Sequence, residues 1–93
     1  MKMIRDTVEA EQTTAFQFDV KGCEFLILNF TGSDIYVSFG EEEDQEDMMR
    51  IGEDMWRVHT CRTDDCKYTS VDTVYVLGGD GAAGEVEIEC LKW

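Results

Sequence analysis

The chain has 93 residues, 43% of them hydrophobic and 11% aromatic, so it is predicted to form one domain (residues 1–93) with a packed core. Twenty-one acidic residues against eight basic ones leave a formal net charge of −13. Such a field repels a nucleic-acid backbone and an anionic membrane surface, so neither is expected as a partner.

The amino-terminal residues contain no apolar stretch of signal-peptide length, and no segment approaches the length of a membrane span. We therefore expect a protein that is cytoplasmic when synthesised. Its four cysteines are then expected to be thiols, because disulfides are rare in that compartment.

Apolar and polar residues alternate with a period of two in one segment after another, which predicts half-buried β-strands. In chain order the predicted strands are 14–22, 23–30, 34–40, 55–60, 70–78 and 84–93. The first dozen residues fit a weak helix or an irregular edge strand, and the strand is preferred. The last segment is the clearest, because Val86, Ile88 and Cys90 alternate with glutamates.

The connections between these segments rely on glycine, since the chain contains no proline. "TGS" at 31–33 predicts a hairpin with a bulged or three-residue loop, and "GGDGAAG" at 78–84 predicts the turn before the last strand. The nearly continuous apolar run at 23–30 predicts a central strand covered on both faces. The fold class predicted is all-β: an antiparallel β-sandwich, jelly roll or small barrel of seven to eight short strands.

Residues 40–47, "GEEEDQED", place six carboxylates in eight positions. Calcium loops need oxygen ligands at fixed offsets between flanking helices, and this run has neither that spacing nor those helices. It is therefore predicted to be a solvated, dispensable loop between strands. The alternative is weak binding of a divalent cation or a basic partner.

His59, Cys61 and Cys66 lie within one short stretch, "HTCRTDDCKY". Zinc prefers four nitrogen and sulfur ligands, usually as two close pairs, and no second close pair exists. Cys23 and Cys90 are predicted to be buried thiols inside strands. We expect no stoichiometric metal and no cofactor; were a metal bound, His59, Cys61 and Cys66 would be its ligands.

Catalysis has little support in the sequence. His59 and Cys61 would share one face of a strand, but no third group that orients them is evident. The glycine-rich stretch at 78–84 precedes a strand instead of the helix that a phosphate site uses. The chain is therefore predicted not to be an enzyme, and no catalytic residue is assigned.

Two tryptophans raise the question of assembly. Trp56, beside Val58, is predicted to lie in the core, whereas Trp93 could lie in the core or at a subunit contact. Strand edges in so small a sandwich must be covered, and the chain offers neither proline nor a helix for this purpose. We expect a homo-oligomer with a strand edge, or Leu91 and Trp93, in the interface, and association that strengthens as salt screens the charge.

Four segments carry a resemblance to a known family: "FQFDVKG" (16–22), "LNFTGSDIYVSFG" (28–40), "RIGEDMWRVH" (50–59) and "TVYVLGGDGAAGEVEIECLKW" (73–93). Together they are similar to small all-β proteins encoded among the head and tail genes of tailed bacteriophages and prophages. In that family a strand ending in Asn-x-Ser/Thr leads by a short turn into an Ile-Tyr-Val-Ser strand. The chain departs from the family in its acidic run, in its paired cysteines and in having Ile-Gly-Glu-Asp where Pro-Ala-Gly is frequent.

The resemblance implies a non-enzymatic structural or assembly protein, a head or tail component of a virion. Its partners would be further copies of the chain or other virion proteins. The alternative is a small binding module for a carbohydrate or a divalent metal, using the loops at 40–47 and 59–66. A ligand that binds only the folded state would stabilise such a module.

Overall fold

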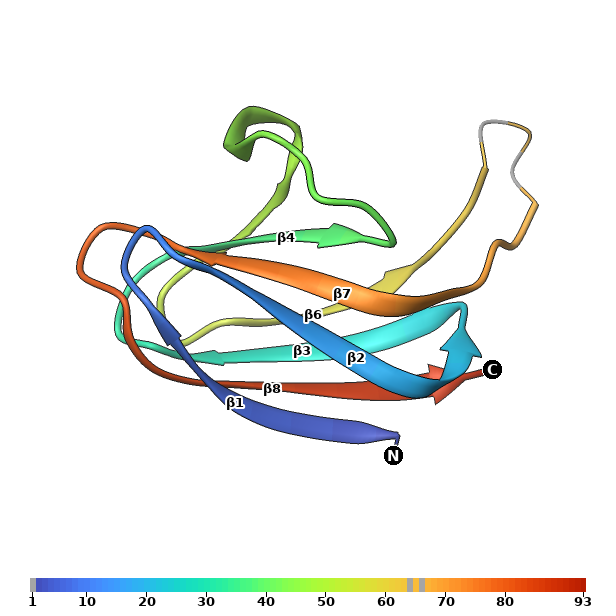
Figure 1. Cartoon of the computed structure of the whole chain (residues 1–93), viewed down its shortest axis with the longest axis horizontal. Helices are drawn as coiled ribbons and strands as arrows, with labels where there is room; N and C mark the ends of the chain where they lie inside the picture. Colours follow the sequence, from blue (N-terminus) through green and yellow to red (C-terminus); the bar gives the residue numbers. More distant parts are fainter. Residues whose placement is uncertain (1, 64, 66) are drawn as a thin grey trace.

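The alternating segments form strands that build two four-stranded antiparallel sheets, packed face to face (Figure 1). The computed structural model describes residues 2–63, 65 and 67–93. The elements are β1 (Met3–Glu9), β2 (Thr13–Gly22), β3 (Glu24–Phe30), β4 (Ile35–Phe39), η1 (Gln45–Asp47), β5 (Met49–Ile51), β6 (Trp56–Thr60), β7 (Val71–Gly78) and β8 (Ala83–Lys92). The described residues contain no α-helix, so the all-β prediction is confirmed. It follows that no described helix has the length and apolar character needed to cross a bilayer.

The strands pair from the two ends of the chain inward: β1 with β8, β2 with β7, β3 with β6, and β4 with β5. The ladder of paired strands is rolled up, which brings β8 beside β3 and β7 beside β4 in two further antiparallel pairings. The resulting sheet orders are β1-β8-β3-β6 and β2-β7-β4-β5, the order of a jelly roll. The predicted fold class is therefore confirmed.

One hydrophobic cluster fills the space between the sheets. Val86, Ile88 and Cys90 face it, as their period predicts, with at most 2% of each residue exposed. Phe25 lies 5.4 Å from Phe18 and 5.7 Å from Phe39, measured between ring centroids. Burying a side chain of this size contributes about 1.5–3 kcal/mol, so this cluster is the main source of stability.

The predicted hairpin at 31–33 is wrong. β3 and β4 belong to different sheets, so this short connection crosses from one sheet to the other (Figure 1). Two smaller expectations also fail: Cys23 lies between β2 and β3 and is only partly buried, and the outer face of β3 is uncovered, with Phe30 55% exposed. In addition, the short strand β5 was not predicted.

Trp56 does not lie in the core, because it is 64% exposed. It pairs with Leu28 on the outer face of its sheet, while Arg57 and His59 pair with the buried Ile27 and Phe25 and so lie on the inward face, although Arg57 stays exposed at the edge of the sheet. The strand β6 was predicted correctly, but its two faces were exchanged. A change of one residue in register moves every side chain to the opposite face.

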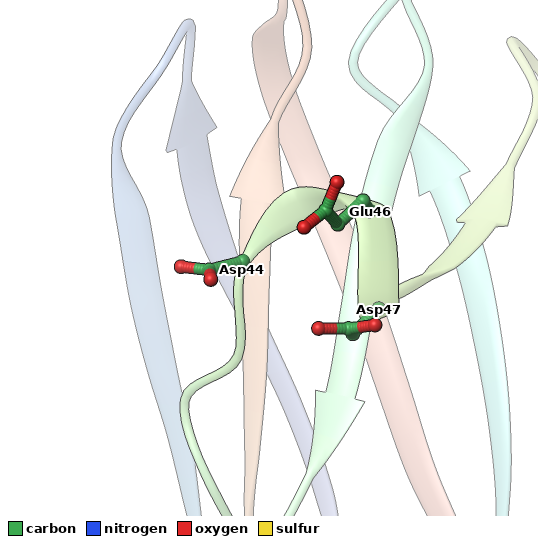
Figure 2. A group of neighbouring side chains, drawn as sticks. All are labelled: Asp44, Glu46 and Asp47. Atoms are coloured by element: carbon green, nitrogen blue, oxygen red, sulfur yellow. The ribbon is translucent and has the colours of Figure 1, made fainter.

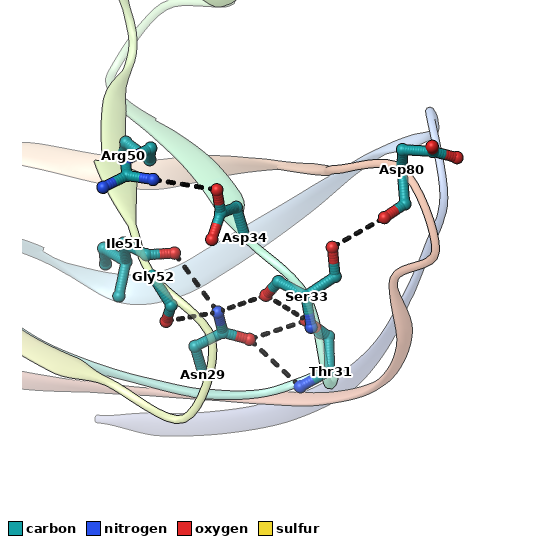
Figure 3. A network of polar contacts seen from close by, with 8 residues as sticks. All are labelled: Asn29, Thr31, Ser33, Asp34, Arg50, Ile51, Gly52 and Asp80. Atoms are coloured by element: carbon teal, nitrogen blue, oxygen red, sulfur yellow. Dashed lines mark hydrogen bonds and ion pairs between the residues drawn. The ribbon is translucent and has the colours of Figure 1, made fainter.

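A buried amide holds the crossover between β3 and β4 in place (Figure 3). The side chain of Asn29, which is 1% exposed, donates hydrogen bonds to the carbonyl oxygens of Ser33 (2.7 Å), Ile51 (3.3 Å) and Gly52 (3.0 Å). Its oxygen accepts hydrogen bonds from the backbone N–H (3.0 Å) and the hydroxyl (2.7 Å) of Thr31. One side chain thus joins the end of β3, the crossover and the segment that follows β5.

Two further contacts extend this network to the surface (Figure 3). The Ser33 hydroxyl donates to the carbonyl oxygen of Asp80, in the turn between β7 and β8, at 2.7 Å. Arg50 pairs with Asp34 at 3.0 Å, although both side chains are solvated enough for this ion pair to contribute little. The crossover is therefore anchored on both sides.

Replacing Asn29 with Ala should lower the free energy of unfolding by roughly 3 kcal/mol, because buried carbonyl groups and a buried N–H would lose their partners. Urea unfolding of the purified chain measures this loss. The matched control is Gln17→Ala, which removes an exposed amide from β2 and should change stability little. Equal stabilities for the two variants would contradict the role given to Asn29.

Candidate functional site: a cleft beside the acidic loop

The connection between β4 and β5 and the segment that follows β6 border one open cleft of about 280 Å³. The residues that line it are Val37, Ser38, Phe39, Glu43, Asp47, Met49, His59, Cys61, Arg62, Thr69 and Val71. The structure thus brings together parts of the two segments, 40–47 and 59–66, that the sequence suggested for a binding module. Cys66 lies outside the described residues.

His59 forms one wall of the cleft. Its ring stacks on Phe39, with 4.2 Å between the ring centroids and 14° between the planes. Burial lowers the pKa of His59, and the positive charge of Arg57 lowers it further. His59 is therefore a neutral imidazole at neutral pH.

Cys61 lies at the inner side of the cleft and is only 4% exposed. Its N–H donates to the carbonyl oxygen of Cys23 at 2.8 Å, and its own carbonyl oxygen accepts from the N–H of Thr69 at 3.1 Å. Burial, together with the smaller effects of the neighbouring Cys23 and Cys90, raises the pKa of the Cys61 thiol to about 11. Burial also raises the pKa of Cys90. These thiols are protonated at neutral pH, and a protonated thiol is a slow nucleophile.

His59 and Cys61 do share the cleft, as their spacing predicted. The pair does not have the chemistry of an activated cysteine, because an activated thiol has a lowered pKa and the pKa of Cys61 is raised. No hydrogen bond orients the His59 ring toward Cys61 within the described part of the chain. The cleft offers a partly apolar wall and a charged rim, which suit binding better than covalent chemistry.

The acidic run forms the outer rim of the cleft. Residues 40–47 are exposed throughout and connect two paired strands, as predicted. Asp44, just before η1, and Glu46 and Asp47 within it place one carboxylate oxygen each within 4.8 Å of the others (Figure 2). No described basic side chain forms an ion pair with these three carboxylates, so they repel one another in solvent.

The suggested interface residues lie at the carboxyl end of the chain. Trp93 is 62% exposed and Leu91 is 36% exposed, so Trp93 is not part of the core. The ammonium group of Lys2 lies 4.5 Å from the centre of the Trp93 ring, a cation–π contact. Leu91 and Trp93 remain available for contact with another molecule.

From the sequence, Cys23 or Cys90 could come close to Cys61 in a folded sheet, but the sequence does not show that both do, as the structure places them. Period-two patterns assign residues to faces of strands, but they do not indicate which strand ends meet. The contact follows from the pairing of β3 with both β6 and β8, which brings the ends of three strands together.

No family model, no curated protein and no solved structure matches the chain. The resemblance to phage head and tail proteins therefore stays a prediction, and the functional argument is based on the geometry of the described residues.

His59 should make the fold less stable in mild acid. Its pKa is lowered in the folded state, so the unfolded chain binds the proton more readily. The free energy of unfolding therefore decreases as the pH is lowered below about 6.5. His59→Phe keeps a ring against Phe39 and removes the titration. We expect the stability of the native chain, relative to this variant, to decrease from pH 7.5 to 5 in urea titrations, whereas a constant difference would contradict the assignment.

The buried thiols should resist alkylation. Mass spectrometry after brief treatment of the native chain with iodoacetamide should show Cys61 and Cys90 unmodified, with modification appearing after unfolding in urea. Rapid modification of Cys61 in the folded chain would mean that it is an accessible thiolate.

Neutralising the acidic loop should stabilise the chain. The quadruple variant Glu42→Gln, Asp44→Asn, Glu46→Gln and Asp47→Asn keeps the length of the loop and removes mutual repulsion, so we expect a Tm higher by roughly 2–4 °C at low salt. The gain should shrink as salt screens the charges. A loss of stability, or a rise in the native Tm with calcium at matched ionic strength, would mean that the carboxylates hold a cation.

Proposed function

We propose that the chain is a non-enzymatic structural or assembly protein, a head or tail component of a tailed phage or prophage particle. It acts through contacts with protein partners, either further copies of the chain or other virion proteins. The protein is made in the cytoplasm and becomes part of the particle.

The observation that carries this proposal is the strand order of a jelly roll, a fold that viral capsid domains use repeatedly. A fold alone does not define a function, because lectins and cupins share this architecture. The family resemblance described above and the exposure of large apolar side chains, including Trp56 and Trp93, add support. Such side chains are typical of protein interfaces.

Quantitative mass spectrometry of purified particles tests the proposal. Particles from a host that carries the gene should contain the chain in several copies, and a strain without the gene should release fewer complete particles. Absence of the chain from particles while it is abundant in the cell would contradict the proposal.

Self-association through Leu91 and Trp93 is the more specific part of the proposal. Light scattering of the purified chain across a salt series should show an oligomer that becomes more stable as salt rises. Trp93→Ser should weaken this oligomer. A chain that stays monomeric at high concentration and high salt would leave only other proteins as partners.

A second candidate function is a small binding module. The observation that favours it is the convergence of Glu43 and Asp47 with His59 and Arg62 around one cleft. A divalent cation or a small carbohydrate that occupied this cleft would raise the Tm in proportion to its binding. Thermal unfolding with calcium, zinc or single monosaccharides, at matched ionic strength, would detect such a ligand.

A further inference from the structure

The outer face of the sheet β1-β8-β3-β6 carries an unusual arrangement of side chains. Beyond a polar row at one end, in which Glu24 pairs with Lys92 at 3.5 Å and accepts from Thr60, register places the outward residues in three rows that cross the strands. The rows are Met3, Glu89, Leu26 and Val58; Arg5, Glu87, Leu28 and Trp56; and Thr7, Glu85 and Phe30. β3 and β6 thus supply an apolar stripe, defined as Leu26, Leu28, Phe30, Trp56 and Val58, and β8 supplies a parallel row of glutamates.

The apolar stripe is open to solvent. Phe30 is 55% exposed, Trp56 64% and Val58 44%, while Leu26 and Leu28 are half-buried between them. The outer face of the other sheet differs, because its corresponding rows contain Tyr36, Ser38, Thr73 and Tyr75, and none of them is a large exposed hydrophobic residue. A contiguous exposed apolar area on one face marks an interaction site.

The glutamate row carries charge that the chain itself does not neutralise. Arg5 pairs with Glu87 at 3.1 Å, and the side chain of Glu87 is only 18% exposed. Glu85 and Glu89 are exposed, and no described basic side chain pairs with either. A partner that covers the apolar stripe therefore meets two free carboxylates along its border.

The edges of the same sheet are poor places for a partner strand. Asp6 on β1 and Arg57 on β6 lie at inward-facing positions, paired with the buried Val86 and Ile27. Inward-pointing charges on edge strands are a known obstacle to edge-to-edge pairing. A partner of this sheet is thus expected to contact its face rather than extend it by another strand.

We propose that the apolar stripe and the glutamate row together bind a different protein chain, whose contact surface is an apolar stripe bordered by lysine or arginine. Charge complementarity selects this occupant for the stripe, because a second copy seated on this face would bring its own glutamate row against Glu85 and Glu89. Trp56, the largest and most exposed member of the stripe, is the central anchor. The inference rests on the proposed function, since it specifies the partner of a protein that acts through protein contacts.

The test uses the purified chain and a synthetic helical peptide whose leucine stripe is bordered by lysines. NMR amide shifts of the labelled chain should change on β3, β6 and β8 when this peptide is added, and binding should weaken as salt rises. A peptide with glutamates in place of the lysines, and a lysine peptide with its leucines scattered, should bind at least about tenfold more weakly.

Matched variants separate the stripe from general attraction to an acidic protein. Trp56→Ser with Val58→Thr should reduce affinity for the lysine peptide about tenfold, whereas Trp93→Ser, which alters an equally exposed tryptophan elsewhere, should not. Glu85→Gln with Glu89→Gln should reduce affinity about threefold at low salt. Glu41→Gln with Glu42→Gln removes the same charge from the acidic loop and should have little effect. Circular dichroism confirms that each variant is folded.

The inference would be overturned if the lysine and glutamate peptides bound equally well or if the lysine peptide did not bind. It would also be overturned if the NMR amide shifts changed only on another face. Self-association through the stripe, abolished by the Trp56 and Val58 changes, would also overturn it, because the occupant would then be a second copy. These results do not depend on whether the chain is found in particles, so failure of this inference and failure of the proposed function are distinguishable.

Discussion

The fold depends on a polar interaction inside an apolar sandwich: the hydrogen bonds of the Asn29 amide. The jelly roll requires the chain to leave one sheet after β3 and enter the other at β4 within four residues. So short a crossing leaves backbone carbonyl groups turned away from both ladders, and a buried carbonyl without a partner is costly. Asn29 satisfies the carbonyl of Ser33 in this crossing and those of Ile51 and Gly52 at the end of β5, and it accepts from Thr31 in return. This gives the Asn-x-Thr pattern of the family resemblance a structural meaning.

With the β3–β4 crossing fixed, the pairing of strands from both ends of the chain inward determines where the cleft and the apolar stripe lie. The two longer connections at the β4–β5 side border the cleft, and the opposite sheet presents the apolar stripe with its glutamate row. These two surfaces differ in chemistry. The cleft contains the Cys61 thiol, whose pKa is raised, and has a charged rim, whereas the stripe exposes a tryptophan and a phenylalanine. The energetics of protein contacts favour the stripe, because large aromatic side chains dominate interfaces.

The sequence predicts the positions of the strands well, but it predicts less well which face of each strand is buried and how the strands are connected. Val86, Ile88 and Cys90 show their inward face directly, because a strand with one buried face must alternate. β6 shows the limit of this logic: "WRVHT" has apolar residues on one face, yet Arg57 and His59 face inward. β6 is an edge strand beside an open cleft, where few core side chains are available to contact it. Its register is therefore set by backbone pairing with Phe25 and Ile27, and not by burial of its apolar residues. The "TGS" turn fits a hairpin and a crossover equally well in its local chemistry. The cleft and the stripe depend on contacts between distant strands, which no local pattern contains.

The central claim is that this protein acts through the outer face of β1-β8-β3-β6 and not through its cleft. Site-specific photo-crosslinking in the native host tests it most directly, with a photoreactive phenylalanine placed in turn at Phe30, at Tyr36 on the other sheet and at Glu43 in the cleft. The account predicts a crosslinked partner chain from position 30 and none from positions 36 and 43. A crosslink from position 43 with none from position 30 would contradict it and would place the functional surface in the cleft.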